Sequence, residues 1–381
     1  MPDRSLRAST PQAVTFVELF FDLVFVFAIT QVTVLAASDL TPAGILRALV
    51  VFWLVWWAWT QFTWTLNPAD ATHPVVRVVT LVATAAAFVM ATAIPNTFGD
   101  GALWFAIPYV AVRGIGLWLQ VRVDMERTNV DRSGIVRWAV ASVPGLVVVL
   151  LGALADPSIR PWAWLGAAAL DLVAATIAGG SASWDLNPAH LVERHGLIEI
   201  IAIGEALIVA GAAVAGQAWS PALIAAAGAA VVAACLLWWT YFGWFNDAAE
   251  HAMTRVPPSG LGQAARDAFS LAHFPLIAGI IGFAVGIKDI VGHPDEPSRP
   301  EVVLALGVGV ALFVGFSAVS WRRLGGGWLP HRLAIVVLMV PGLVLAAPLA
   351  PVGSLVVVAV ALAAIVAIEE LRPPTAGHAP G

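Results

Sequence analysis

The sequence predicts an all-α fold, a polytopic transmembrane helix bundle with about 12 spans arranged as two parallel six-helix repeats. Of its 381 residues, 60% are hydrophobic and only 11% are charged, whereas a soluble domain carries about 25% charged residues. Stretches of about 20 apolar residues, the length needed to cross the hydrocarbon core of a bilayer, recur along the chain. They are continuously apolar rather than alternating, which excludes a membrane β-barrel.

Twelve such stretches are predicted, separated by turn signals such as Asn67–Pro68 and Asn187–Pro188. They cover residues 14–37, 43–66, 74–94, 102–123, 134–155, 162–181, 193–214, 221–245, 268–288, 300–321, 331–349 and 352–370.

Four short motifs of the first half recur in the second half, in the same order and at offsets of roughly 181 to 200 residues. The pairs are 17–22 with 198–205, 56–60 with 238–242, 73–74 with 273–275, and 143–147 with 340–344. An even number of spans separates the copies, so both have the same orientation and the repeat is parallel. The predicted organisation is a tail (1–13), a first repeat (14–181), a second repeat (182–371) and a second tail (372–381).

Positive charge predicts the orientation. With the N-terminus inside, the termini and even-numbered loops hold 14 of the 19 Lys and Arg residues, and the odd-numbered loops and their flanks hold four. The positive-inside rule therefore predicts a cell-membrane protein with both termini cytoplasmic. The net charge of -5 and the lack of a basic run give no reason to expect a nucleic-acid partner. The expected partners are the lipid bilayer and a small solute or ion, and the sequence indicates no oligomeric state.

Ionisable residues within the spans carry the functional information, because each costs at least about 2.5 kcal/mol at the centre of the membrane. Four are predicted near mid-depth: Asp22, Arg113, Asp171 and Glu205. In a structural interpretation, one acid pairs with Arg113 and the others hydrogen-bond between helices. In a functional interpretation, one arginine cannot neutralise three acids, so the unpaired acids carry protons or bind a cation. Asp22 is the first choice and Glu205, facing it from the other repeat, is the second.

Two further pairs lie one helical turn apart. Glu18 and Asp22 share a helix face without a basic residue nearby in sequence, which suits a proton or cation site. His195 and Glu199 have the same spacing, which a metal site could use. The alternative is a capped helix entrance with a Glu–Arg pair at the cytoplasmic interface. His273 fits either a buried hydrogen-bonded histidine or a proton relay.

Motifs for catalysis and cofactors are missing from the sequence. It contains no Walker A motif, no GxSxG elbow, no HExxH motif and no GxGxxG motif following a strand. We therefore expect no cofactor, no metal centre and no enzymatic activity.

Four stretches resemble the bacterial low-temperature-requirement A (LtrA) family: VELFFDLVFVFA at 17–28, ERHGLIEIIAIGE at 193–205, WWTYF at 238–242 and HFPLIAG at 273–279. The likeness covers about residues 14–370. Ile198 and Glu199 depart from it, standing where a bulky apolar residue and a less charged one are expected. The resemblance implies a polytopic bacterial membrane protein linked by name to growth in the cold, without an agreed substrate or mechanism.

Three functions remain open from the sequence. The first is a proton- or cation-coupled secondary transporter, favoured by acids at mid-depth. The second is a structural or regulatory membrane protein for cold adaptation. The third is an intramembrane enzyme that acts on a lipid or quinone through the 193–205 cluster.

Overall fold

The computed structural model describes residues 5–8, 10, 12–127, 133–179, 184–348 and 350–372. Contacts group the chain into two compact units. Unit 1 comprises Met1–Arg194 and Pro257–Gln263, and unit 2 comprises His195–Val256 and Ala264–Gly381.

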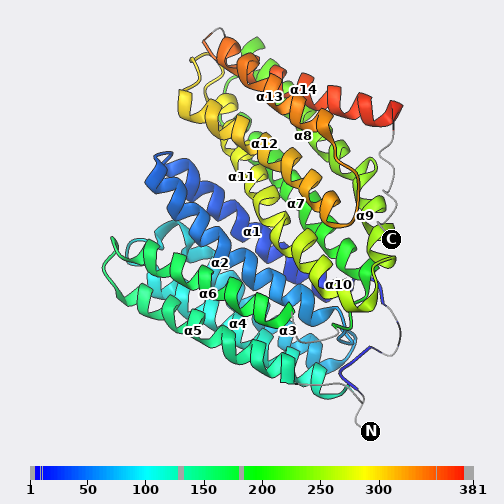
Figure 1. Cartoon of the computed structure of the whole chain (residues 1–381). Helices are drawn as coiled ribbons and strands as arrows, with labels where there is room; N and C mark the ends of the chain where they lie inside the picture. Colours follow the sequence, from blue (N-terminus) through cyan, green and yellow to red (C-terminus); the bar gives the residue numbers. More distant parts are fainter. Residues whose placement is uncertain are drawn as a thin grey trace. The chain divides into compact units, whose positions relative to one another are not determined.

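The described residues form helices, which confirms the predicted all-α class (Figure 1). Unit 1 contains α1 Phe16–Ser38, α2 Pro42–Leu66, α3 Pro74–Ala93, the short 3₁₀ helix η1 Ile94–Asn96, α4 Ala102–Met125, α5 Ser133–Leu154 and α6 Arg160–Gly179. Helix α7, Pro188–Ala215, begins in unit 1 and continues in unit 2. Unit 2 contains α8 Pro221–Phe242, α9 Phe245–Thr254, most of the α10–η2 segment, α11 His273–Gly292, α12 Pro300–Arg323, α13 Pro330–Ala346 and α14 Pro351–Leu371. In that segment, α10 Pro258–Ala265 is followed by the π-helical turn η2, Arg266–Leu271.

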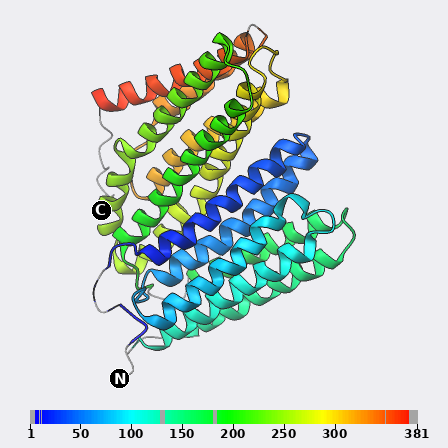
Figure 2. The same cartoon turned by 180° about the vertical axis from the view of Figure 1, so that it is seen from behind.

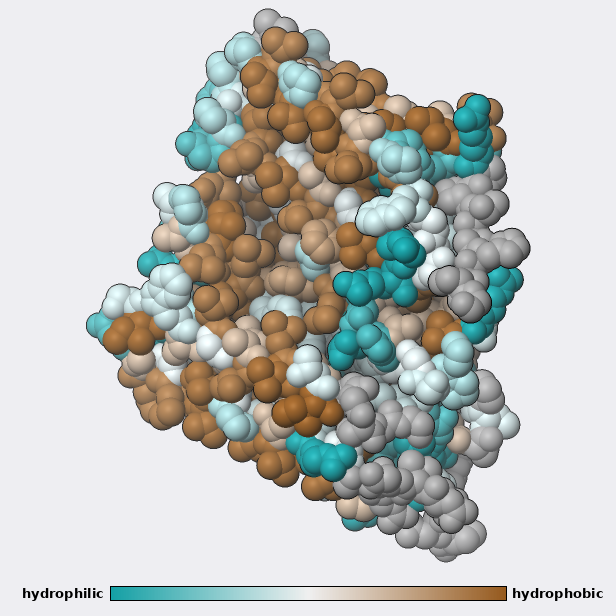
Figure 3. Space-filling view, viewed as in Figure 1, coloured by the Kyte–Doolittle hydropathy of each residue, from teal (hydrophilic) through white to brown (hydrophobic). Residues whose placement is uncertain are grey.

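Ten helical stretches in the described part of the chain are long and apolar enough to cross a membrane. They include α8 joined to α9 and α10 joined to α11, and they leave out α6 and the 17-residue apolar helix α13. A helix coincides with each of the twelve predicted segments. The outer face of α5 and α6 is mainly apolar (Figure 3), with Val140, Val147 and Leu151 exposed. This is the surface expected of a multi-pass membrane protein.

Helix α7 begins five residues before the predicted segment. Pro188 occupies its first position, where a proline has a suitable φ and its missing N–H is no loss. The Asn187–Pro188 turn signal therefore marks the helix start itself. As a consequence, His190 and Arg194 lie inside the helix rather than at its entrance.

The N-terminal segment and the even-numbered loops of unit 1 lie on one side of that unit. The Leu6 backbone N–H donates to Glu126 at the end of α4 (2.8 Å), and Asp70 N–H donates to the Leu6 carbonyl (2.7 Å). Asn67 after α2 donates to the Asn187 carbonyl before α7 (3.0 Å). The helices of unit 1 therefore alternate in direction, as successive spans must; Figure 2 shows α1 beside α2 and α3.

The internal repeat stays a prediction, as do its boundaries. Four helix pairings in unit 1 have counterparts in unit 2 at the positions that the repeat assigns. They are α2–α6 with α8–α14, α3–α4 with α11–α12, α4–α5 with α12–α13, and α5–α6 with α13–α14.

Helices α11 and α12 pack with their backbones in close approach. A Cβ atom on Gly279 would lie 2.5 Å from the Gly309 carbonyl oxygen, and one on Gly309 would lie 2.6 Å from the Gly279 carbonyl oxygen. Small residues allow such approaches between membrane helices, where van der Waals packing replaces the hydrophobic effect as the main attraction.

We predict that Gly309→Ala lowers the free energy of unfolding by about 1–3 kcal/mol, because overpacking pushes the α11 and α12 backbones apart. Gly315→Ala is the matched control, since the same helix carries Gly315 with nothing within 4 Å of its added Cβ. Unfolding of the purified protein in a denaturing detergent measures both variants. Equal stability of the two variants would contradict the close packing.

Candidate functional site

Arg194 forms the centre of a buried ionic cluster in unit 1, the Arg194 cluster, made of Glu18, Asp22, Trp59, His190 and Arg194. Its Nη1 atom lies 2.9 Å from Glu18 Oε1, and its Nη2 atom lies 2.5 Å from Asp22 Oδ1. All three side chains are completely buried. Glu18 and Asp22 are one turn apart on α1, so one guanidinium at the start of α7 reaches both carboxylates.

Further donors surround the two acids. The Trp59 indole donates to Asp22 Oδ1 (2.7 Å), and His190 Nε2 lies 3.1 Å from Glu18 Oε1. Thr15, which precedes α1, donates to Glu18 Oε2 through both its backbone N–H and its hydroxyl. The cluster holds two carboxylates against one guanidinium, so it carries an excess negative charge unless the His190 imidazole is protonated.

The cluster corrects one interpretation of the sequence. Arg194 does not form a Glu–Arg pair at the start of its helix, because its side chain is fully buried and pairs with acids of α1. Glu193 is the exposed residue there, and it accepts a hydrogen bond from Val14 N–H (3.2 Å). Glu18 and Asp22 do have a basic partner, although it lies more than 170 positions away in the chain.

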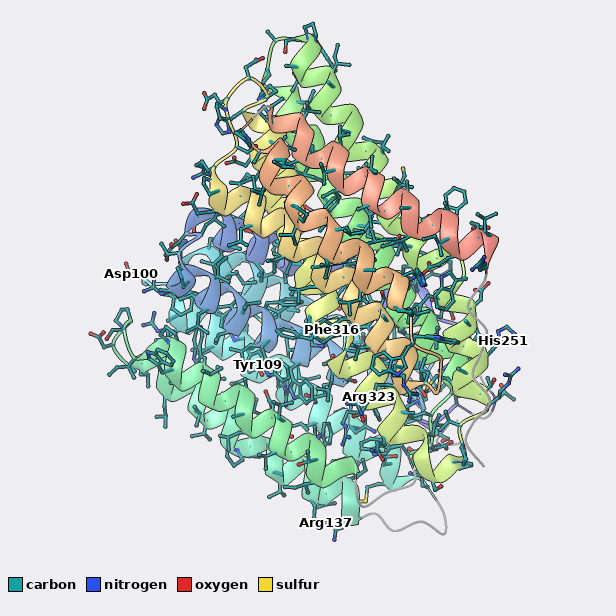
Figure 4. The ribbon with its side chains drawn as sticks, turned by 45° about the horizontal axis from the view of Figure 1, so that its top comes forward. Asp100, Tyr109, Arg137, His251, Phe316 and Arg323 are labelled. Carbon is teal, nitrogen blue, oxygen red and sulfur yellow. The ribbon has the colours of Figure 1, made fainter. Side chains whose placement is uncertain are left out.

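A second buried pair joins α4 to α6 in unit 1. Arg113 Nη2 lies 3.1 Å from Asp171 Oδ1, and the two side chains are 0% and 2% exposed. Arg113 also donates to the Tyr109 hydroxyl (3.4 Å), and Figure 4 shows Tyr109 among the helices of unit 1 while Asp100 lies at its edge. The pairing of Arg113 with one mid-depth acid is the one expected in the structural interpretation, and it leaves no net charge.

Unit 2 holds a different kind of cluster, the Glu199 cluster, made of His195, Glu199, Tyr241, Phe269 and His273. Glu199 is completely buried, and neither of its carboxyl oxygens has a hydrogen-bond partner among the described residues. Tyr241 is near enough to interact with it electrostatically. One turn before Glu199 on α7, the His195 ring centroid lies 5.2 Å from that of His273 and 5.0 Å from that of Phe269.

His273 links the Glu199 cluster to a distorted helix. Its Nδ1 atom lies 2.8 Å from the Ala268 carbonyl and its Nε2 atom lies 2.9 Å from the Tyr241 hydroxyl. A carbonyl only accepts, so Nδ1 carries the proton and Nε2 accepts from Tyr241. Ala268 lies in the π-helical turn η2, and its carbonyl also accepts from the Ser320 hydroxyl (2.8 Å). Such turns inside α-helices are frequent at functional sites.

A further buried arginine, Arg332, joins α13 to α14. Arg332 is 1% exposed, and its Nε and Nη2 atoms lie 2.7 and 2.9 Å from the two carboxyl oxygens of Glu369. It also donates to the Ser317 hydroxyl (2.6 Å) and to the Thr240 carbonyl (3.0 Å). Four helices of unit 2 therefore meet at one guanidinium. Arg332 is the third residue of α13, and no local pattern in the sequence indicates its partner on α14.

The other predicted site residue, Glu205, lies half-buried on α7 in unit 2. Its predicted approach to Asp22 joins the two units and stays a prediction. Within the described residues, no three His, Cys, Asp or Glu side chains are placed to hold a metal ion together.

Comparison with known proteins gives one family and one distant relative. The model of the family described as bacterial low temperature requirement A protein (LtrA) matches residues 13–367. An uncharacterized protein of Rhizobium meliloti (strain 1021) is 27% identical over 336 residues, which cover 83% of this chain and 79% of the relative. No solved structure matches the chain.

We predict that Arg194→Met lowers the free energy of unfolding by about 3–5 kcal/mol, because it leaves two buried carboxylates without their cation. Adding Glu18→Gln and Asp22→Asn to that variant restores most of the loss, since the charges are then gone. Detergent unfolding measures all variants. Arg47→Met, which breaks a half-exposed pair with Asp39, is the control and costs under about 1 kcal/mol. A cost for Arg194→Met no greater than for the control would refute the cluster.

Proposed function

The chain belongs to the bacterial low temperature requirement A family, and we propose that it is a secondary carrier that couples the movement of a small solute to protons. Glu199 is the group that carries the proton. The carrier is not an enzyme in this proposal, and it needs no cofactor.

The observation that supports the proposal most directly is the isolation of Glu199. A carboxylate in an apolar interior needs a compensating charge, which comes from a fixed cation or from a mobile ion. Glu18 and Asp22 have Arg194 as their fixed cation, and Asp171 has Arg113. The carboxyl oxygens of Glu199 have no hydrogen-bond donor in the described part of the chain. Its compensating charge is therefore a mobile one, which is what coupling to an ion gradient requires.

The surroundings of Glu199 favour a proton over a metal cation. Hard cations such as Ca²⁺ and Mg²⁺ take six or more oxygen ligands. The Glu199 cluster contains the imidazole of His195, one turn from Glu199, the phenol of Tyr241, and the imidazole of His273, which contacts both Tyr241 and His195. Imidazoles exchange protons near neutral pH. The Tyr241–His273–Ala268 hydrogen-bond chain has a defined direction, so it supplies an ordered set of proton donors and acceptors.

The choice of Glu199 changes the ranking made from the sequence, where Asp22 came first. Asp22 accepts from both Arg194 and Trp59 through Oδ1, and it shares the Arg194 cation with Glu18. Glu199 has no hydrogen-bond donor among the described residues. Glu205, the second choice, keeps its place as a further candidate. The Arg194 cluster then has a supporting role, holding α1 against the start of α7.

We propose further that both termini lie in the cytoplasm. The N-terminal segment lies on the same side of unit 1 as the ends of α2 and α4, and the end of α4 carries Arg122 and Arg127. Reporter fusions after residue 372 test this. A cytoplasm-active reporter gives signal there, and a periplasm-active reporter in the α3–α4 loop gives signal at Asp100. The opposite pattern would overturn the orientation.

The proton-carrying role predicts two results for Glu199→Gln. In vesicles that contain a trapped pH dye, the rate of proton movement driven by a solute gradient falls to that of protein-free vesicles. Infrared difference spectra against wild type lose the carboxylic-acid C=O band of one buried acid. Glu193→Gln is the matched control, because it makes the same change at an exposed acid on the same helix, and it leaves both readouts unchanged.

Each readout has an outcome that contradicts the proposal. Proton movement that persists in Glu199→Gln removes Glu199 from the coupling. An infrared band that is unchanged in Glu199→Gln shows an ionised side chain. If no solute drives proton movement in wild type, the regulatory function is favoured instead.

A further inference from the structure

An apolar groove runs between α12 and α13 in unit 2, with a volume of about 620 Å³. Its walls include Val303, Leu304, Val308, Ala311, Val340 and Val344. The floor is partly glycine, because Gly307 leaves room there opposite Leu343. On the outer surface of a membrane protein, such a groove faces lipid chains rather than water.

A polar pocket of about 280 Å³ continues the groove at the end where α12 begins. Pro297 and Ser298 line both spaces, so the two are contiguous. The pocket adds the ionisable residues Asp289, His293, Glu296 and Arg299, and His293 Nδ1 lies 3.1 Å from the Asp289 carbonyl. The Ser298 hydroxyl at the junction is buried and has no hydrogen-bond partner among the described residues.

We propose that groove and pocket together bind one phospholipid whose headgroup bears a phosphate and a primary ammonium, as in phosphatidylethanolamine. From Pro300 to Ala311 the groove extends about 16 Å along α12 at 1.5 Å per residue. Half of the hydrocarbon core measures about 15 Å. The groove thus has the length of one acyl chain in one leaflet, and the pocket lies where the headgroup of that lipid belongs.

The charges of the pocket select the headgroup. Arg299 Nη2 lies 2.5 Å from Asp289 Oδ1, and its side chain is 62% exposed, which leaves the outer face of the guanidinium for a phosphate. Glu296 is exposed and has no ion pair among the described residues, so its carboxylate is placed for an ammonium group. A headgroup with a phosphate but no ammonium would leave the negative charge of Glu296 without a positive partner. Ser298 lies at the junction of groove and pocket, so its hydroxyl can donate to the ester carbonyl that joins the acyl chain to the glycerol of the lipid.

Photocrosslinking tests the position of the lipid. The full-length protein is reconstituted in vesicles that contain phosphatidylethanolamine with a photoreactive acyl chain, and the crosslinked residues are mapped by mass spectrometry. The expected result is enrichment at 303–311 and 340–347 over the exposed face of α14 around Val356 and Val360. An even distribution over both surfaces would overturn the proposal.

Two variants with the same substitution test the groove. Ala311→Phe fills it, whereas Ala359→Phe adds the same bulk on α14 away from it. Loss of the enrichment in Ala311→Phe alone supports the site. Equal enrichment in both variants, with both folded by detergent unfolding, would overturn it.

Native mass spectrometry tests the headgroup with phosphatidylethanolamine, phosphatidylcholine and phosphatidylglycerol as separate probes. Phosphatidylethanolamine is expected to remain bound at the highest collision energy, because only it offers N–H donors to Glu296. Arg299→Ala and Glu296→Gln each remove that advantage. Equal or stronger retention of phosphatidylglycerol by the wild type would overturn the headgroup assignment.

Discussion

The pairing of Arg194 with Glu18 and Asp22 is the interaction on which the rest of unit 1 depends. Charges in an apolar interior are tolerated only with a compensating partner. Removing one partner of a buried ion pair destabilises a protein far more than replacing both partners by apolar residues. The pairing therefore fixes the start of α7 against α1. Trp59 brings α2 to the same point, and the Asn67–Asn187 hydrogen bond holds the adjoining loops. One guanidinium thus fixes the relative positions of three helices.

The same constraint explains the other buried arginines and sets Glu199 apart. Arg113 compensates Asp171, and Arg332 compensates Glu369 with two hydrogen bonds. Each pair is closed: the charges are balanced, and the partners come from neighbouring helices within one unit. Glu199 is also fully buried, and among the described residues it is the buried acid whose two carboxyl oxygens both lack a hydrogen-bond donor. This is the reason why the proposed function assigns the exchanging proton to Glu199.

The sequence predicts the helices well and the site only in part, for a physical reason. Long apolar runs reveal spans directly, because length and hydropathy are local properties. Burial is not a local property in the same sense: Arg194 is the seventh residue of α7, which begins at Pro188 instead of residue 193, and its side chain is fully buried. The partners of the buried arginines lie 37 to 176 positions away in the chain, and no local pattern in a single sequence identifies them.

The stretches that carry the resemblance to the family contain residues of both clusters. Glu18, Asp22 and Arg194 lie within the stretches 17–28 and 193–205 that carry the resemblance. Glu199 lies in the second stretch but departs from it, standing where a less charged residue is expected. The pairing of Arg194 with Glu18 and Asp22 holds the start of α7 in place whether or not residue 199 is ionisable. In the proposed function, proton coupling through Glu199 depends on a helix whose start the Arg194 cluster already holds in place.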